Sequence, residues 1–317
     1  MKIDHIPAKE DILETYRRIR DKIHKTPVYT SRFLNQLTGC DLFFKCENFQ
    51  KVGAFKARGA ANASFSLPID RLENGIATHS SGNHAQALAF AAGLLKIRAY
   101  VIMPGNAPAV KINAVRTYGA EIIFCDPTLE AREKELNRIV NETGAYFIHP
   151  YNDYDVIAGQ ATAAFELFEQ APDLDAVITP VGGGGLLSGT ALSRNYFSKG
   201  TKIYAGEPEG AGDAYLSLRK NKIIPSIKPH TVADGLLTSL GTRTFPIIRE
   251  NVERIILVND EEIIQAMKLI WERMKIIVEP SAAVSLAALI KEKSHFKNCK
   301  TGLILSGGNV DINSLPF

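Results

Sequence analysis

The sequence has little of several features that mark specialised classes of protein. Only four of its 317 residues are cysteines (Cys40, Cys46, Cys125 and Cys299), and no two of them form a CxxC pair. Zinc sites and redox dithiols commonly use such pairs, so this spacing indicates neither. We expect four reduced, mostly buried thiols, as is usual for a cytoplasmic protein.

Charge of one sign is also scarce. The chain has 37 basic and 34 acidic residues, a formal net charge of +3, and no block of like charges. Proteins that bind nucleic acid or a membrane surface commonly carry a concentrated basic excess. We therefore expect neither a nucleic-acid partner nor a membrane partner.

Long apolar runs are missing as well. None approaches the roughly 20 residues that cross a bilayer. The first residues, MKIDHIPAKEDIL, carry charges where a signal peptide has an apolar core. With 45% hydrophobic and 22% charged residues, the composition is that of an ordinary globular protein long enough for two modest domains. These features predict a cytoplasmic location.

Glycine, in contrast, is concentrated in one place. Residues 181–189 read VGGGGLLSG, between an apolar stretch at 175–181 that predicts a buried strand and a helical pattern at 186–197. A glycine loop at a helix start presents backbone N–H groups and the positive end of the helix dipole, so it suits an anion such as a phosphate. The alternative is a mobile turn without a ligand.

Strand-like and helix-like segments alternate along most of the chain. Short apolar runs predict strands at 42–49, 75–79, 99–104, 121–126, 202–208, 254–258 and 301–306. Helical patterns cover 109–120, 128–144 (opened by Thr128 and closed by Gly144) and 259–274 (capped by Asn259 or Asp260). This alternation predicts an α/β fold of open, mostly parallel, twisted sheets flanked by helices, with ligands at the carboxyl ends of strands.

Three more stretches fall at predicted strand ends or helix starts: GAFKARGA (53–60), SSGNHAQA (80–87) and LSGGNVD (305–311). Lys56 is either a solvated charge or an amine that forms a Schiff base once burial lowers its pKa. The SSGN segment suits a carboxylate, or caps a helix through Ser81 or Asn83. Ser306 either belongs to a tight turn or directs a hydroxyl at a ligand.

Together and in this order, these stretches resemble fold-type II pyridoxal-phosphate enzymes, the tryptophan synthase β-like family. Within it the chain is similar to the serine/threonine dehydratase and serine racemase branch, from TPVYTSRFLN (26–35) to LSGGNVD. The resemblance implies a large cofactor-binding domain of residues 1–52 and 150–317. It also implies a small domain of residues 53–149, with the active site in the cleft between the two domains.

The resemblance assigns the cofactor to named residues. Lys56 would form the Schiff base and then move the proton at Cα, Phe55 would pack on the ring, and Asn83 would bind the phenolic oxygen. The phosphate would lie on Gly182, Gly183, Gly184 and Gly185, and Ser306 would face the pyridine nitrogen. A neutral hydroxyl there leaves the ring a weaker electron sink than a carboxylate would, which favours rapid β-elimination.

Substrate contacts follow from the same resemblance. The substrate would meet Ser80, Ser81, Asn83, His84, Arg132 and Thr238. Ser81 matches the second proton-transfer residue of racemases, opposite Lys56. Arg132 matches an arginine that can clamp a second carboxylate, as in 3-hydroxyaspartate, although an arginine on a helix is more often solvated.

A divalent cation and a nucleotide are also implied. Glu207, Asp213 and the carbonyl of Ala211 match an oxygen-only site for Mg²⁺, Ca²⁺ or Mn²⁺, with an acidic surface loop as the alternative. Four residues match parts of an ATP-activator site: Lys51, Tyr118, Lys275 and Asn309. The family suggests a homodimer.

The leading hypothesis is a pyridoxal-phosphate-dependent dehydratase that converts L-serine, L-threonine or a related 3-hydroxy amino acid to a 2-oxo acid and ammonia. The alternatives are a serine racemase, a 3-hydroxyaspartate dehydratase and a β-replacement synthase. A nucleotide-binding dehydrogenase is disfavoured, because no GxGxxG follows an early strand. A non-catalytic amino-acid-binding protein would leave Lys56 idle.

Overall fold

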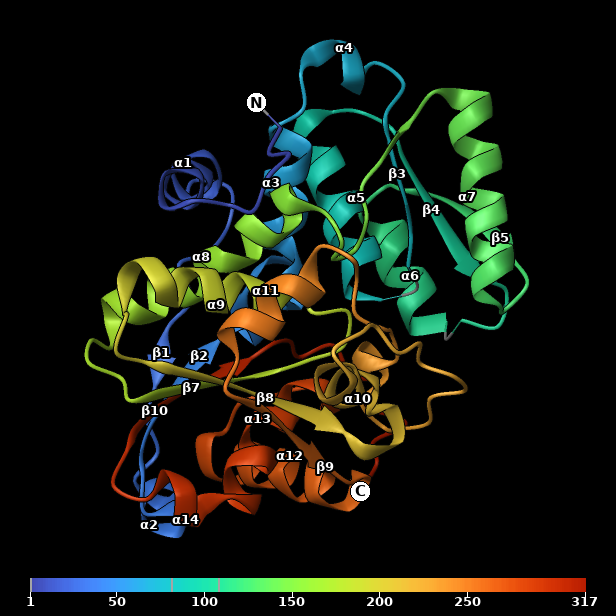
Figure 1. Cartoon of the computed structure of the whole chain (residues 1–317). Coiled ribbons are helices and arrows are strands. Elements are labelled where there is room, and N and C mark those ends of the chain that lie inside the picture. Colours follow the sequence, from blue (N-terminus) through green and yellow to red (C-terminus); the bar gives the residue numbers. More distant parts are fainter. Residues whose placement is uncertain (1, 81, 108) are drawn as a thin grey trace.

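The computed structural model describes residues 2–80, 82–107 and 109–317, and for residue 129 it describes only the backbone. Within these residues, ten strands form two sheets (Figure 1). The six-stranded sheet has the order β1 (Val28–Tyr29), β2 (Asp41–Cys46), β10 (Lys300–Leu305), β7 (Ala176–Pro180), β8 (Lys202–Pro208), β9 (Arg254–Val258). The four-stranded sheet has the order β5 (Glu121–Cys125), β4 (Ala99–Pro104), β3 (Ile76–His79), β6 (Tyr146–Phe147).

The predicted α/β class with mostly parallel sheets is confirmed. In the described part of the chain, every pair of neighbouring strands is parallel except β1 and β2 at one edge. The bounds of β4, β8 and β9 are those that the sequence predicts. The strand predicted at 42–49 ends earlier, at Cys46, and residues Glu47–Phe49 form the 3-10 helix η1. There the Glu47 carboxylate accepts hydrogen bonds from Arg58 inside the protein.

Helices cover both faces of the six-stranded sheet (Figure 1). One face carries α8 (Tyr154–Gln170), α9 (Gly185–Phe197) and α11 (Thr244–Asn251), and the other carries α12 (Asp260–Met274) and α13 (Pro280–Lys291). The alternation of a strand supplies both interiors. Ile178 packs among the residues of α12 and α13, while its neighbour Val177 packs with Leu167 and Leu187 of α8 and α9.

The four-stranded sheet is covered in the same way. Helix α5 (Asn83–Leu95) packs where Ile76 points, and α7 (Leu129–Thr143) packs where Ala77 points. Thr128 caps α7 by accepting a hydrogen bond from the N–H of Ala131, and Gly144 closes it in the left-handed conformation, as predicted. Helix α6 (Ala109–Thr117) ends before residue 120, because the chain turns at Gly119 with φ +80°.

The remaining elements connect and flank these layers. They are α1 (Lys9–Ile19), α2 (Arg32–Thr38), η2 (Lys51–Gly53), α3 (Lys56–Phe65), α4 (Ile69–Leu72), η3 (Glu209–Ala211), α10 (Asp213–Lys220), η4 (Asp234–Leu236) and α14 (Lys293–Phe296). Helices α3 and α8 cross in backbone contact, since a Cβ added to Gly159 would lie 2.5 Å from the Cα of Gly59. The domain limits at 53 and 149 stay a prediction.

All four cysteines are free thiols. Cys40 and Cys46 are buried, whereas Cys125 and Cys299 are half-buried, so two of the four match the expected burial. Within the described ranges, none of the helices combines the length and the apolar character needed to cross a membrane.

Candidate active site

Lys56 is the first residue of α3 and its amine is buried. Its Nζ donates a hydrogen bond of 2.8 Å to the carbonyl oxygen of Pro150, just before α8, and lies 5.2 Å from the centroid of the Phe55 ring. Burial lowers the pKa of Lys56 to about 8, against an opposing effect of the Glu279 carboxylate. A lysine with such a pKa supplies neutral, nucleophilic amine near physiological pH.

Ser306 lies beside this lysine because two distant segments pair. The N–H of Phe55 donates to the carbonyl of Ser306 at 3.0 Å, and the N–H of Gly308 donates to the carbonyl of Gly53 at 2.9 Å. These bonds flank an isolated bridge between residues 54 and 307. Ser306 is 3% exposed and directly follows β10, so its hydroxyl lies at the carboxyl end of a central strand.

The four glycines link β7 to α9 and are all buried. Gly184 has φ +88°, a conformation that favours glycine. A Cβ on Gly183 would lie 2.4 Å from the ring of Tyr151, and one on Gly182 would lie 3.0 Å from the backbone of Leu236. The first N–H groups of α9 have no partner within the helix, so the loop forms a close-fitting cradle of donors.

Asn83 is the first residue of α5, and its side chain bonds to Glu279 at the start of α13. Its Nδ2 donates to both carboxylate oxygens of Glu279, at 2.9 and 3.1 Å, and its Oδ1 accepts from Asn309 Nδ2 at 2.8 Å. Glu279 is 5% exposed, and burial raises its pKa to about 7 although the Asn83 amide opposes this shift. The helix cap is Gly82, so Asn83 does not act as the cap and its amide faces the site.

The histidine next to it is buried and uncharged. His84 Nε2 lies 3.4 Å from the carbonyl of Ile148, and its Nδ1 is buried without a partner among the described residues. Burial and the neighbouring Lys56 charge hold the pKa of His84 well below its usual range. Ser80 follows β3, and its Oγ accepts a long hydrogen bond from the N–H of Gly82. Ser81, the predicted second proton-transfer residue, lies outside the described residues.

Arg132 belongs to α7, and Thr238 lies in the segment that follows η4. Arg132 is half-buried, its Nε donates to the carbonyl of Thr128 at 3.3 Å, and its charge adds to the effect of burial in lowering the pKa of His79. The Thr238 hydroxyl lies 3.4 Å from where a Cβ of Gly182 would be. Thr238 thus lies against the glycine loop, while the contact of Arg132 with a substrate stays a prediction.

Glu207 and Asp213 lie near each other behind this loop. Both oxygens of Glu207 accept backbone N–H bonds, from Ala214 at 2.7 Å and Tyr215 at 2.8 Å. Both oxygens of Asp213 are buried, and neither accepts a well-formed hydrogen bond from the described residues, although the Ser226 hydroxyl lies near enough to oppose the rise in the Asp213 pKa. Burial raises the pKa of Glu207 to about 8 and that of Asp213 to about 6. Ala211 ends η3 between them.

An orphaned buried carboxylate of this kind fits a cation. In the described ranges no three side chains of the His, Cys, Asp or Glu type gather to hold a metal, so a cation here would need carbonyl oxygens and water as well.

The residues predicted to meet a nucleotide are spread over several elements. Lys51 opens η2, Tyr118 is 36% exposed and contacts Phe90 edge-on, and Lys275 ends α12 with φ +60°. Asn309 is already bonded, through its Nδ2, to Val52 and Asn83.

Sequence reasoning missed Glu279, Tyr151 and the Pro150 carbonyl. Glu279 directly precedes Pro280, the first residue of α13, so its place at a helix start was a weak signal. Tyr151 follows His149 and Pro150 in a segment that carries no regular pattern, and its role shows only when Gly183 is brought against its ring.

Comparisons with known proteins fit this geometry. A family model described as "Pyridoxal-phosphate dependent enzyme" matches residues 19–307. The chain is 51% identical over 310 residues to a serine racemase of Dictyostelium discoideum, with 96% of each chain covered. It is 49% identical to a beta-hydroxyaspartate dehydratase of Paracoccus denitrificans, with 99% of each chain covered. The crystal structure of a threonine deaminase from T.th. superposes with a TM-score of 0.92 at 42% identity, covering 96% of this chain and 99% of the other.

Proposed function

Because the chain belongs to the family of pyridoxal-phosphate dependent enzymes, we propose that it is a dehydratase of 3-hydroxy amino acids. The substrates would be L-serine, L-threonine or 3-hydroxyaspartate, and the products a 2-oxo acid and ammonia. The observation that carries the proposal is the buried Lys56 amine, with its lowered pKa, next to Ser306 at the end of β10. The names of the relatives, a serine racemase and a beta-hydroxyaspartate dehydratase, support the substrate class.

The residues present fit the cofactor. A Cβ on Gly183 or Gly184 would clash and one on Gly182 or Gly185 would be tight, and the loop presents the free N–H groups of the α9 start, as a phosphate requires. Lys56 would hold the cofactor covalently, Asn83 would donate to its phenolic oxygen, and Ser306 would meet its ring nitrogen. When bound, pyridoxal phosphate withdraws electrons from the bonds at Cα of an amino acid.

Lys56 would remove the proton from Cα of the substrate. Its amine is the buried base at the centre of the site, and the Pro150 carbonyl fixes the direction of Nζ. The side chains of His84 and His149 have pKa values well below the usual range because they are buried, so the histidines beside Lys56 are neutral. The lysine can therefore take up and return a proton without competing cations on these two rings.

Ser306 favours rapid elimination of the substrate's Cβ hydroxyl. Its hydroxyl is neutral, so it does not hold a positive charge on a ring nitrogen as a carboxylate would. The overall reaction removes the Cα proton and the Cβ hydroxyl as water and then takes up one water to release ammonia. L-serine thus gives pyruvate and ammonia with no net change in water, oxidant or reductant.

A product balance tests this function. Purified protein is incubated with pyridoxal phosphate, Mg²⁺ and each of the three substrates, and the 2-oxo acid, ammonia and both enantiomers of the amino acid are quantified. We expect equal amounts of 2-oxo acid and ammonia, and loss of turnover in Lys56→Ala. The exposed Lys202→Ala serves as the matched control. Full activity of Lys56→Ala would overturn the assignment.

Serine racemase is the second candidate, favoured by the 51% identity to the Dictyostelium protein of that name. It requires proton transfer on both faces of Cα, and the sequence assigns the second face to Ser81. We expect Ser81→Ala to remove D-serine formation while sparing most pyruvate formation from L-serine. Equal loss of both products would assign Ser81 a structural or substrate-clamping role instead.

A divalent cation, Mg²⁺ before Ca²⁺ or Mn²⁺, would bind Glu207, Asp213 and the Ala211 carbonyl. The cation site is supported by the buried carboxylate of Asp213, which accepts no well-formed hydrogen bond from the described residues. ATP as an activator rests only on the sequence match of Lys51, Tyr118, Lys275 and Asn309, and titration of activity with ATP tests it.

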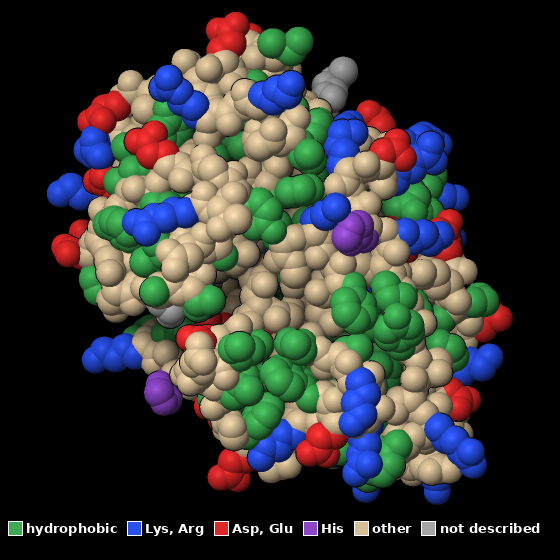
Figure 2. Space-filling view, turned by 180° about the vertical axis from the view of Figure 1, so that it is seen from behind, with side chains coloured by type: hydrophobic (Ala, Val, Ile, Leu, Met, Phe, Trp, Pro, Cys, Tyr) green, Lys and Arg blue, Asp and Glu red, His purple; other side chains and the backbone are tan. Residues whose placement is uncertain are grey.

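We also propose a homodimer in the cytoplasm. Hydrophobic side chains gather in patches on the lower half of the face shown in Figure 2, over the part that holds the six-stranded sheet. Large apolar side chains exposed by 40–50% include Tyr29, Phe33, Leu37, Phe49 and Ile277. Sedimentation equilibrium gives the mass in solution, and a monomer at micromolar concentration would contradict the dimer. Cell fractionation tests the location.

A further inference from the structure

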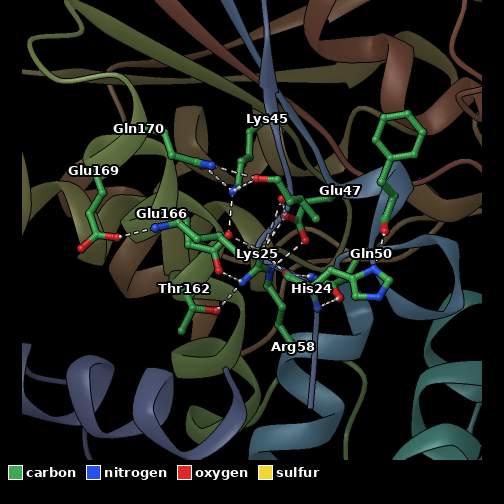
Figure 3. A network of polar contacts seen from close by, with 12 residues as sticks. His24, Lys25, Lys45, Glu47, Gln50, Arg58, Thr162, Glu166, Glu169 and Gln170 are labelled. Carbon is green, nitrogen blue, oxygen red and sulfur yellow. Dashed lines mark hydrogen bonds and ion pairs between the residues drawn. The ribbon is translucent and has the colours of Figure 1, made fainter. Parts of the chain in front are cut away.

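A buried ionic network joins β2, η1, α3 and α8, apart from the site residues described above (Figure 3). Its charged members are Lys45 of β2, Glu47 of η1, Arg58 of α3 and Glu166 of α8, and each is at most 1% exposed. Two positive and two negative charges balance, as burial without water requires.

Arg58 is the centre of this network. Its Nε and Nη2 donate to the two oxygens of Glu47 at 2.7 and 2.8 Å. Its Nη1 and Nη2 donate to the two oxygens of Glu166 at 2.9 and 2.8 Å. The planar guanidinium is therefore held by two carboxylates, each in a two-pronged pair, and such pairs fix direction as well as distance.

Lys45 completes the charge balance, and its hydrogen bonds to the described residues do not involve α3. Its Nζ donates to Glu166 at 2.6 Å, to the Thr26 carbonyl at 2.8 Å and to Gln170 at 2.8 Å. Its partners lie on α8 and in the segment before β1. The network thus contains one cation on the lysine-bearing helix and one cation on a strand.

Arg58 and Lys56 are two residues apart in the first turn of one helix. Each residue advances an α-helix by about 100°, so their side chains leave α3 on nearly opposite sides. Lys56 faces Pro150, and Arg58 faces Glu47 and Glu166. Any rotation of α3 about its axis that moved Lys56 would also pull the guanidinium off its carboxylates.

No side chain caps the start of α3, because the cap residue Phe55 makes no such hydrogen bond. The acceptor of the Lys56 amine, Pro150, lies just before α8, and α8 carries Glu166. Arg58 therefore connects α3, which carries Lys56, to α8, which follows the Pro150 carbonyl that the Lys56 amine binds. The backbone contact at Gly59 and Gly159 holds the same two helices together at the next residue.

We propose that Arg58 is a positioning residue: through Glu47 and Glu166 it sets the rotation of α3 and thereby the place of the Lys56 amine. The proposal rests on the proposed function only in that Lys56 is the working lysine. The position of the amine itself is measurable in cofactor-free protein.

The test compares Arg58→Lys with Lys45→Met. The first keeps the charge on α3 but loses the two-pronged pairs, and the second removes a charge from the same network without touching α3. For each variant the melting temperature is measured. The acetylation rate of Lys56 in cofactor-free protein is then followed against pH by mass spectrometry, and kcat and KM are measured on the holoenzyme.

We expect both variants to melt lower than the wild type. Only Arg58→Lys should move the midpoint of Lys56 acetylation from about 8 toward the ordinary 10.5, because the amine leaves its buried place. The rate at which Lys56 binds the cofactor covalently and kcat should each fall at least about tenfold in Arg58→Lys, with a much smaller change in KM. A displacement of the reacting amine by about 1 Å lowers a rate by that much or more.

Equal midpoints in Arg58→Lys, Lys45→Met and the wild type would overturn the proposal and leave the network a purely structural role. If Arg58→Lys does not fold, Glu47→Gln gives the same comparison, because it weakens one pair of Arg58 at constant size. A wild type that binds no pyridoxal phosphate would sink the proposed function, while the acetylation midpoint would still decide the positioning role.

Discussion

The side-chain amide of Asn83 donates to both oxygens of Glu279, at 2.9 and 3.1 Å, across 196 residues of sequence. This pair joins the start of α5, behind the four-stranded sheet, to the start of α13, on the six-stranded sheet. It also places a carboxyl group whose pKa burial raises to about 7 close to the lysine of the site.

Glu279 predicts a pH dependence of stability. Its folded pKa of about 7 exceeds the ordinary 4.5, so between these values the folded protein binds the extra proton. Stability from this group is therefore full below pH 4.5 and declines as pH rises to about 7. The difference in the free energy of unfolding between Glu279→Gln and the wild type, measured with urea, should shift by about 2–3 kcal/mol in favour of the variant from pH 5 to pH 8. The exposed Glu261→Gln should show the same difference at both values, and a pH-independent difference for Glu279→Gln would contradict the raised pKa.

Gly183→Ala tests the fit of the glycine loop. The new Cβ would lie 2.4 Å from the Tyr151 ring, so ring or loop must shift. We expect a loss of about 1–3 kcal/mol in stability and weaker pyridoxal-phosphate binding, measured by equilibrium titration. Gly200→Ala, which meets nothing within 4 Å, is the control. In a Tyr151→Ala background the loss caused by Gly183→Ala should be smaller than in the wild type, and an equal loss in both would show that the clash with Tyr151 is not the cause.

Arg132 predicts a difference between substrates. If its guanidinium clamps a second carboxylate, Arg132→Gln should lower kcat/KM for 3-hydroxyaspartate about 10- to 100-fold. The value for L-serine should change far less. Arg138→Gln is the matched control, because Arg138 lies on the same helix and pairs outward with Glu135 and Glu142. A similar loss for both substrates would assign Arg132 to the structure rather than to recognition.

The carboxyl pair Glu207 and Asp213 predicts a pH-dependent effect of Mg²⁺. Their pKa values are raised to about 8 and about 6, so ionising them costs stability as pH rises through this range. A bound cation offsets that cost. Millimolar Mg²⁺ should therefore raise the melting temperature more at pH 8.5 than at pH 6. Asp213→Asn should lose the effect and the exposed Asp173→Asn should keep it, while a Mg²⁺ effect independent of pH and of Asp213 would exclude this site.

The sequence predicts well whatever is encoded by neighbouring residues. The ends of α7 follow from Thr128 and Gly144, and β8 follows from a short apolar run, because caps and strand burial act over a few residues. The order of four motifs suggests the family. The parallel sheets follow from the alternation of elements.

The contacts that complete the site could not be predicted in this way. Glu279 meets Asn83, and Arg58 meets Glu166 across 108 residues, yet each is an ordinary charged or polar residue in its local sequence. Their partners become known only when the elements pack. Glu47 shows the same limit, since its local sequence predicts a strand, whereas in the structure it starts η1 and binds Arg58 through its carboxylate.

The place of β10 has a consequence for how the protein is made. This strand lies between β2 and β7, and Ser306 follows it directly. During synthesis, β2 and β7 leave the ribosome long before residues 300–305, and they have no common neighbour until that strand arrives. The six-stranded sheet can therefore be completed only after almost all of residues 1–308 have emerged, and the segment of Ser306 can pair with that of Lys56 only then. Until that point the nascent chain must avoid aggregation without a complete cofactor site.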